Sequence, residues 1–116
     1  MLRAKLFQAC ITEARVAYDG SLGIDQALMD LVGLYAYEKI LVANMTNGNR
    51  LETYVIPEAA GSRRIVLNGA AARLGSAGDR VIVMSFCTVD EAEVRDGRYR
   101  PRIVRLDEQN RPTEAT

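Results

Sequence analysis

The chain has 116 residues, enough for one domain with its own hydrophobic core. Fifteen basic and fifteen acidic residues cancel, so no net field attracts nucleic acid. Histidine is absent, which excludes a Ser-His-Asp triad, a Cys-His pair and a histidine-ligated metal. The two cysteines are too few for a disulfide framework or a four-cysteine zinc site. The chemistry must therefore use Lys, Arg, Tyr, Ser, Thr or carboxylate side chains.

No apolar segment of the sequence is long enough to cross a membrane. The longest, residues 81–89, is interrupted by Ser85 and Thr88 and falls far below the ~20 residues needed. The first residues carry no long apolar stretch of the kind found in secretory signals. We therefore expect a cytoplasmic protein with no membrane partner.

The spacing of Gly, Asn and Pro predicts a compact, mostly β fold. These residues interrupt the chain about every ten positions, so we expect one domain over residues 1–116. Residues 2–11 alternate and then lose their alternation, which predicts a long first strand with a bulge. Residues 16–18 are expected to continue extended into a corner at Gly20-Ser21.

The middle of the chain predicts a short helix and a hairpin. Asp25 can cap a helix over residues 26–32, and Gly33 can end it. Residues 40–44 and 51–56 are expected to form strands around Asn-Gly, a strong hairpin signal that Pro57 should close.

The rest of the chain predicts further strands and a frayed end. Strands are expected over residues 64–67, 81–87 and 99–106, with one helical turn over residues 70–73. Pro101 and recurring arginines mark residues 99–106 as an edge strand. From about residue 108 the chain is polar, and we expect a disordered tail.

The segment Tyr18-Asp19-Gly20-Ser21 allows two interpretations. Most Gly-Ser pairs only turn the chain. A serine hydroxyl can also attack the carbonyl of the preceding residue and exchange the amide for an ester, and glycine there tolerates the strained angles that expose that carbonyl. Elimination from the ester leaves dehydroalanine, which hydrolyses to a pyruvoyl group, an electrophilic ketone. Taken alone, the segment leaves both interpretations open.

Other polar residues could serve such an electrophile. Lys5 either reaches solvent from its strand or faces a carboxylate. Arg50 can grip a carboxylate bidentately if it points inward. By strand alternation Thr53 and Tyr54 face opposite sides unless a bulge redirects one of them; a threonine hydroxyl can polarise a carbonyl and a tyrosine phenol can deliver a proton. The small residues of 68–71, Asn-Gly-Ala-Ala, let backbone N–H groups approach a ligand.

The order of these motifs is more specific than any one of them. From about Lys5 to Phe86 the chain carries Lys-Leu, Y-D-G-S, G-I-D-Q-A-L-M-D, T-N-G-N-R-L-E-T-Y, N-G-A-A-A and G-D-x-V-I-V. In this combination it resembles the aspartate 1-decarboxylases, pyruvoyl enzymes that make β-alanine for pantothenate. The resemblance implies a double-psi β-barrel that assembles as a homotetramer, with active sites between neighbouring subunits.

The resemblance also implies roles for single residues. Cleavage falls between Gly20 and Ser21, and Ser21 becomes the covalent pyruvoyl cofactor that forms an imine with L-aspartate. Tyr54 matches the proton donor, and Thr53 the threonine that assists cleavage and contacts substrate. The other matched positions are Lys5 and Arg50, which hold substrate carboxylates, Asn68 beside the pyruvoyl, the substrate-contacting Gly69, Ala70 and Ala71, and Tyr18 before the cleavage site.

The sequence departs from the family pattern near its start. Members commonly read Lys-[Ile/Leu]-His-Arg where this chain has Lys5-Leu6-Phe7-Gln8, and Arg73 stands where the family often has histidine. Two alternatives therefore stay open: a divergent pyruvoyl decarboxylase acting on another amino acid, because Phe7 makes the pocket wall more apolar, or an uncleaved, non-catalytic barrel module. The resemblance also leaves open a separate maturation factor as a partner.

Overall fold

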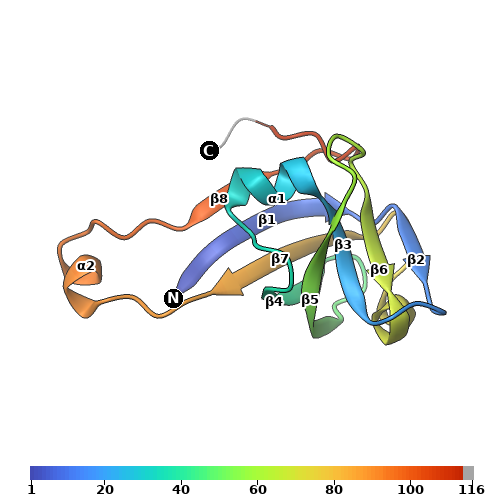
Figure 1. The fold of residues 1–116 in the computed structure, drawn as a ribbon, viewed down its shortest axis with the longest axis horizontal. Coiled ribbons are helices and arrows are strands. Elements are labelled where there is room, and N and C mark those ends of the chain that lie inside the picture. Colours follow the sequence, from blue (N-terminus) through green and yellow to red (C-terminus); the bar gives the residue numbers. More distant parts are fainter. Residues whose placement is uncertain (114–116) are drawn as a thin grey trace.

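The computed structural model describes residues 1–113, and within them eight strands form one strongly curved sheet (Figure 1). The strands are β1 (Leu2–Cys10), β2 (Glu13–Arg15), β3 (Ser21–Asp25), β4 (Lys39–Asn44), β5 (Arg50–Glu58), β6 (Ile65–Asn68), β7 (Arg80–Phe86) and β8 (Arg102–Arg105). Their order is β2-β6-β3-β5-β4-β7-β1-β8. The helical segments are α1 (Gln26–Val32), the 3-10 helix η1 (Gly69–Leu74) and α2 (Glu91–Arg95).

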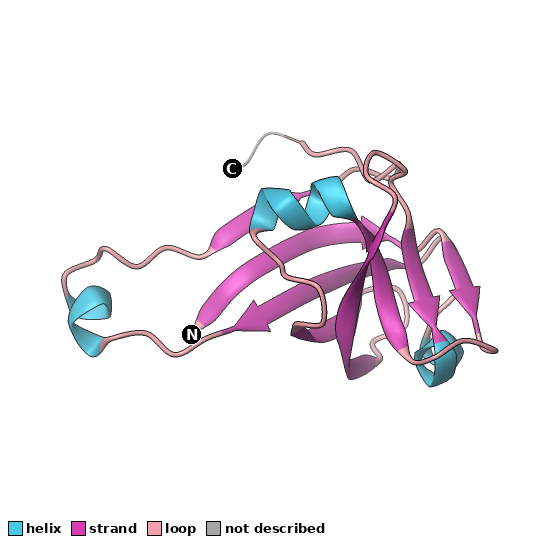
Figure 2. Ribbon diagram, viewed as in Figure 1, coloured by secondary structure: helices cyan, strands magenta, loops and turns pink. Residues whose placement is uncertain are grey.

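Parallel and antiparallel pairs are mixed in this sheet. Parallel pairing joins β1 with β8, β2 with β6 and β3 with β5, while the remaining neighbours are antiparallel. Short helices cover little of the sheet (Figure 2). The expected fold class, a mostly β double-psi barrel, is confirmed.

Alternating apolar side chains of the strands fill the barrel. The fully buried ones include Leu6, Leu22, Val42, Val55 and Val83, each at most 1% exposed. In β7 every second residue is buried, as strand geometry leads one to expect, whereas every residue of β3 and β6 is buried. The hydrophobic effect of this burial holds the strands that carry the candidate residues in fixed register.

The first strand and the helix follow the sequence prediction closely. The ladder between β1 and β7 shifts register between Leu6 and Ala9, which confirms the bulge. Asp25 accepts a hydrogen bond from Ala27 N at 2.8 Å, and Gly33 ends α1 with φ of 74°. α1 packs on β1, β3, β5 and β8. Among residues 1–113, no helix has the length and apolar character of a membrane span.

Two local predictions were wrong. Residues 16–18 are not extended: β2 ends at Arg15, and the chain then turns. Pro57 does not close the hairpin, because β5 runs on to Glu58, where its second half pairs with β3 in parallel. The short helix α2 was not expected, since none of its side chains is buried and its sequence shows no apolar face.

The C-terminal segment is more ordered than its polarity indicated. Asn110 is 1% exposed, and its side chain accepts from Cys10 N at 2.7 Å and donates to Cys10 O at 2.8 Å and Arg63 O at 3.0 Å. These bonds hold the chain up to residue 113, in place of a tail disordered from about residue 108. Residues 114–116 lie outside the described residues.

Candidate active site

Ser21 and Asn68 form a buried polar pair at the start of β3. Ser21 lies opposite Asn68 in the antiparallel ladder, and Asn68 Nδ2 donates to Ser21 Oγ at 3.1 Å. On the other side of Asn68 lies Arg15, its partner in the parallel β2–β6 ladder. Residues 16–20 therefore turn around the end of β6, which explains why they are not extended. The turn places the Gly20–Ser21 bond beside Asn68.

The amide oxygen of Asn68 is an unusual feature of this pair. Asn68 is 2% exposed, and among the described residues its Oδ1 has no hydrogen-bond partner. An unmade bond at a buried polar atom costs about 1–3 kcal/mol. The amide thus presents a donor to Ser21 and a free acceptor beside it. A pyruvoyl group at position 21 fits this pair, because Nδ2 can hold its ketone oxygen while Oδ1 stays free for an N–H group.

Gly69 packs directly against the turn formed by residues 16–20. Its φ of 69° is left-handed, and a Cβ there would lie 2.7 Å from Gly20 Cα, 2.7 Å from Gly20 N and 2.8 Å from Tyr18 O. Such contacts require a glycine. Gly20 itself has open space around a Cβ and is not among the left-handed glycines of the described chain. The sequence analysis expected strained backbone angles at Gly20. In the structure, the position that requires a glycine is Gly69.

A cavity of about 270 Å³ opens beside the Gly20–Ser21 bond. The predicted site residues Gly20, Thr53, Ala70 and Ala71 line it, together with Leu51, Glu52 and Leu74. Thr53 is half-buried on β5, and the two alanines stand on η1. The structure thus brings these four predicted residues together in one hollow.

Two asparagines of the β4–β5 turn hold the end of η1, the helix that lines this cavity. Asn47 Nδ2 and Asn49 Nδ2 donate to Leu74 O at 3.0 and 3.2 Å, and Leu74 is the last residue of η1. The turn is thereby tied to the helix that carries the alanines. The sequence T-N-G-N indicated a hairpin. It did not indicate the hydrogen bonds to Leu74, because that carbonyl is 25 or more residues away in the chain.

Tyr54 takes a different environment from Thr53. It does not line the cavity beside Gly20; its side chain is 37% exposed, and its ring lies 6.2 Å from that of Tyr37, centroid to centroid. The opposite facing of Thr53 and Tyr54 agrees with strand alternation. Tyr37 has φ of 70°, rare for an aromatic residue, and its backbone N donates to Val55 O at 2.7 Å.

Lys5 lies far from Ser21 along the sheet. It is on β1, and β7, β4 and β5 stand between β1 and β3. Lys5 pairs with Met84, Met84 with Leu41 and Leu41 with Glu52, so these side chains share one face.

Arg50 and Tyr54 belong to the same face. Each is two residues from Glu52 on β5, and all three are exposed. Three predicted site residues, Lys5, Arg50 and Tyr54, therefore stand on the outer face of the sheet and do not line the Gly20 cavity, although Glu52 of the same face borders it.

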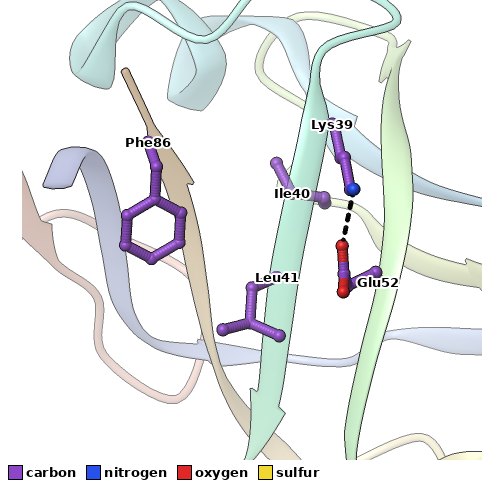
Figure 3. A pocket seen from close by; sticks show the side chains of 5 residues that line it. All are labelled: Lys39, Ile40, Leu41, Glu52 and Phe86. Carbon is purple, nitrogen blue, oxygen red and sulfur yellow. Dashed lines mark ion pairs between the residues drawn. The ribbon is translucent and has the colours of Figure 1, made fainter. Parts of the chain in front are cut away.

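A second hollow of about 390 Å³ lies on this outer face (Figure 3). Its lining residues are Lys39, Ile40, Leu41, Glu52 and Phe86. Lys39 Nζ lies 2.8 Å from Glu52 Oε2, and this hydrogen bond raises the pKa of Lys39. Glu52 is thus paired with Lys39, and within residues 1–113 Arg50 forms no ion pair.

Comparison with known proteins decides the family. The family described as aspartate decarboxylase matches residues 1–113. The chain belongs to this family. The aspartate 1-decarboxylase of Salinibacter ruber is 49% identical over 114 residues, which cover 98% of this chain and 77% of that protein. That of Leptospira biflexa is 47% identical over 113 residues, 97% of this chain and 95% of the relative.

The match confirms the resemblance and extends it. The motifs carried it only to about Phe86, whereas the aspartate decarboxylase family covers the chain to residue 113. A further relative, the aspartate 1-decarboxylase of Syntrophobacter fumaroxidans, is 47% identical over 112 residues, 97% of this chain and 89% of its own length.

Proposed function

We propose that this chain is an aspartate 1-decarboxylase that converts L-aspartate to β-alanine after cleaving itself between Gly20 and Ser21. Membership of the family supports the activity. The observation that carries the cleavage is the buried Ser21–Asn68 hydrogen bond at the end of a turn packed on Gly69. A plain Gly-Ser turn requires none of these features.

The cleavage uses the chain's own atoms. Ser21 Oγ attacks the Gly20 carbonyl carbon, the C–N bond breaks, and the nitrogen takes the hydroxyl proton, which leaves an ester. Loss of the Ser21 Cα proton then expels the Gly20 carboxylate and leaves dehydroalanine, and water replaces its nitrogen as ammonia to give the pyruvoyl group. Asn68 orients Oγ through its amide N–H, and Thr53 polarises the Gly20 carbonyl from the cavity.

Decarboxylation then draws on both groups of site residues. A pyruvoyl group at position 21 would supply an electrophilic carbonyl that can react with the substrate's amino group and accept the electrons left when CO2 departs. Asn68 holds this group, and the backbone of 69–71 lies against the substrate. Lys5 and Arg50 bind the substrate carboxylates, and Tyr54 returns a proton to carbon.

The site is completed by a second copy of the chain in a homotetramer. Three strands separate β1 from β3 along the curved sheet, and Lys5, on the outer face, does not line the cavity beside Gly20–Ser21 of its own chain. Lys5 therefore acts in the active site of a neighbouring copy.

Co-expression of Lys5→Gln and Ser21→Ala chains tests this arrangement. Mixed oligomers regain activity if Lys5 serves the serine of another copy, because each inactive chain then supplies the residue that the other lacks. No recovery in oligomers shown by mass to contain both chains would contradict it.

Intact-mass measurement tests the function as a whole. The purified chain should separate into a 20-residue fragment ending at Gly20 and a fragment starting with the pyruvoyl group. The cleaved protein should then convert L-aspartate to β-alanine. An uncleaved chain without decarboxylase activity would support the alternative of a non-catalytic module. The need for a maturation factor and the cytoplasmic location stay predictions.

A further inference from the structure

The ring of Phe7 is contacted by two cations. Lys5 Nζ lies 5.0 Å from the ring centroid, and Arg105 Cζ lies 4.7 Å from it. Both distances fall within the ~6 Å at which an aromatic face attracts a cation. Lys5, a predicted substrate-binding residue, therefore has a cationic neighbour that the sequence motifs do not indicate.

The strands, rather than flexible surface side chains, build this group. Lys5 and Phe7 are two residues apart on β1 and share a face. Arg105 is the residue opposite Phe7 in the parallel ladder between β1 and β8, and Leu106 N donates to Phe7 O at 2.9 Å. All three side chains are half-buried. Their proximity is thus set by backbone register.

The charge of this group is not balanced by protein carboxylates. Within residues 1–113, neither Lys5 nor Arg105 forms an ion pair. Arg105 Nη1 has a long contact of 3.4 Å with the neutral Gln8 Oε1. Two positive charges around one ring repel each other, so an anion that binds both lowers the energy of the group.

A hollow that Arg105 also borders is a poorer place for that anion. This open hollow of about 440 Å³ is also lined by Arg80 and Arg111 and by the acidic residues Asp107 and Glu108. Arg80 donates to the carbonyls of Gln8 and Leu106, and Arg111 is paired with Asp107 at 2.9 Å. These guanidinium groups already have acceptors, so the anion is expected on the Phe7 side of Arg105, within reach of Lys5.

We infer that Arg105 and Lys5 together form a carboxylate-binding site, with Phe7 as the ring that positions both cations. The inference rests on the proposed function, in which Lys5 binds a carboxylate of L-aspartate. Arg105 adds a planar fork that can grip the same carboxylate bidentately. Two cations at one end of the substrate favour a carboxylate over a neutral amide, so Arg105 helps to distinguish aspartate from asparagine.

Succinate binding tests the site without requiring turnover. Succinate has both carboxylates of aspartate but no amino group, so calorimetry on the purified protein reports carboxylate recognition alone. Arg105→Gln and Lys5→Gln should each weaken succinate about ten- to a hundred-fold, the effect of losing a charge-assisted hydrogen bond. Arg102→Gln is the matched control: it removes the same charge from the same strand and should stay within twofold.

Kinetics on aspartate give the second measurement. Arg105→Gln should raise KM for L-aspartate by a similar factor and narrow the preference over asparagine, while cleavage at Ser21 proceeds as in the parent. If Arg105→Gln does not fold, Arg105→Lys keeps the charge without the fork, and succinate should weaken at least threefold. Unchanged succinate affinity in the variant that folds overturns the inference, and so does a loss that Lys5→Gln does not share.

The two proposals fail in different ways. If the parent protein decarboxylates aspartate but Arg105 does not affect succinate binding or KM, the function stands and the inference falls. If the protein has no decarboxylase activity yet binds succinate through Lys5 and Arg105, the function falls and the carboxylate site stands.

Discussion

Replacing Gly69 by alanine tests whether the packing of the 16–20 turn on η1 controls self-cleavage. The left-handed φ of 69° costs an alanine about 1–2 kcal/mol. In addition, the new Cβ meets three backbone atoms at 2.7–2.8 Å, all of them in Tyr18 and Gly20. Backbone cannot rotate away as a side chain can, so overpacking of this kind adds roughly 1–3 kcal/mol.

The structure offers a control that separates these two costs. Gly97 has φ of 77°, close to that of Gly69, but a Cβ there meets nothing within 4 Å. Gly97→Ala therefore measures the backbone cost alone. Both replacements should be compared in chains that also carry Ser21→Ala, so that all molecules stay uncleaved. The thermal midpoint of the Gly69 variant should lie at least about 4 °C below that of the Gly97 variant.

Cleavage should respond more strongly than stability. Relief of the clash pushes Gly20 away from η1 and lengthens the contact between Ser21 and Asn68, and displacements near 1 Å can cost roughly a hundred-fold in rate. With Ser21 intact, Gly69→Ala should cleave at least tenfold more slowly than Gly97→Ala, as followed by intact mass over time. If both variants cleave at the parent rate, the turn does not need its contact with Gly69, and the geometric argument for maturation is wrong.

The other predictions concern single side chains. Ser21→Ala should remain one intact chain; a split at residue 20 in this variant would rule out the serine chemistry. Arg50→Lys should mature normally but lose roughly ten- to a hundred-fold in kcat/KM on aspartate, because the ammonium cannot form a bidentate pair. Tyr54→Phe should mature normally, while its turnover falls by roughly 10²–10⁴; parent-like turnover would make Tyr54 a scaffold residue.

The sequence predicted those parts of the fold that depend on neighbours in the chain. Asp25 and Gly33 bound α1 as expected, since a cap and a left-handed stop are local features. The parallel pairs could not be read from periodicity, and the errors at residues 16–18 and at Pro57 follow from them. Both segments adapt to strands that lie far away in the sequence.

The candidate site likewise has residues that the sequence motifs indicated and features that only the fold brings about. Motif order identified Ser21, Asn68 and Thr53, and the fold brings their segments together. Motifs did not indicate the unpartnered Oδ1 of Asn68 or the approach of Gly69 to Gly20, because these arise where β6 and β3 meet. Arg105 was seen only as one of several edge-strand arginines, since its contact with Phe7 depends on the β1–β8 register.

The separation of the two groups of residues has a consequence for how variants should be interpreted. In the proposed function, cleavage involves Ser21, Asn68, Gly69 and Thr53, which lie around the start of β3, whereas Lys5 and the rest of the outer face act on substrate. Outer-face variants should therefore mature normally and fail only in turnover. If Lys5→Gln instead blocks cleavage, the neighbouring copy must already be in place before the Gly20–Ser21 bond can break, and assembly would precede maturation.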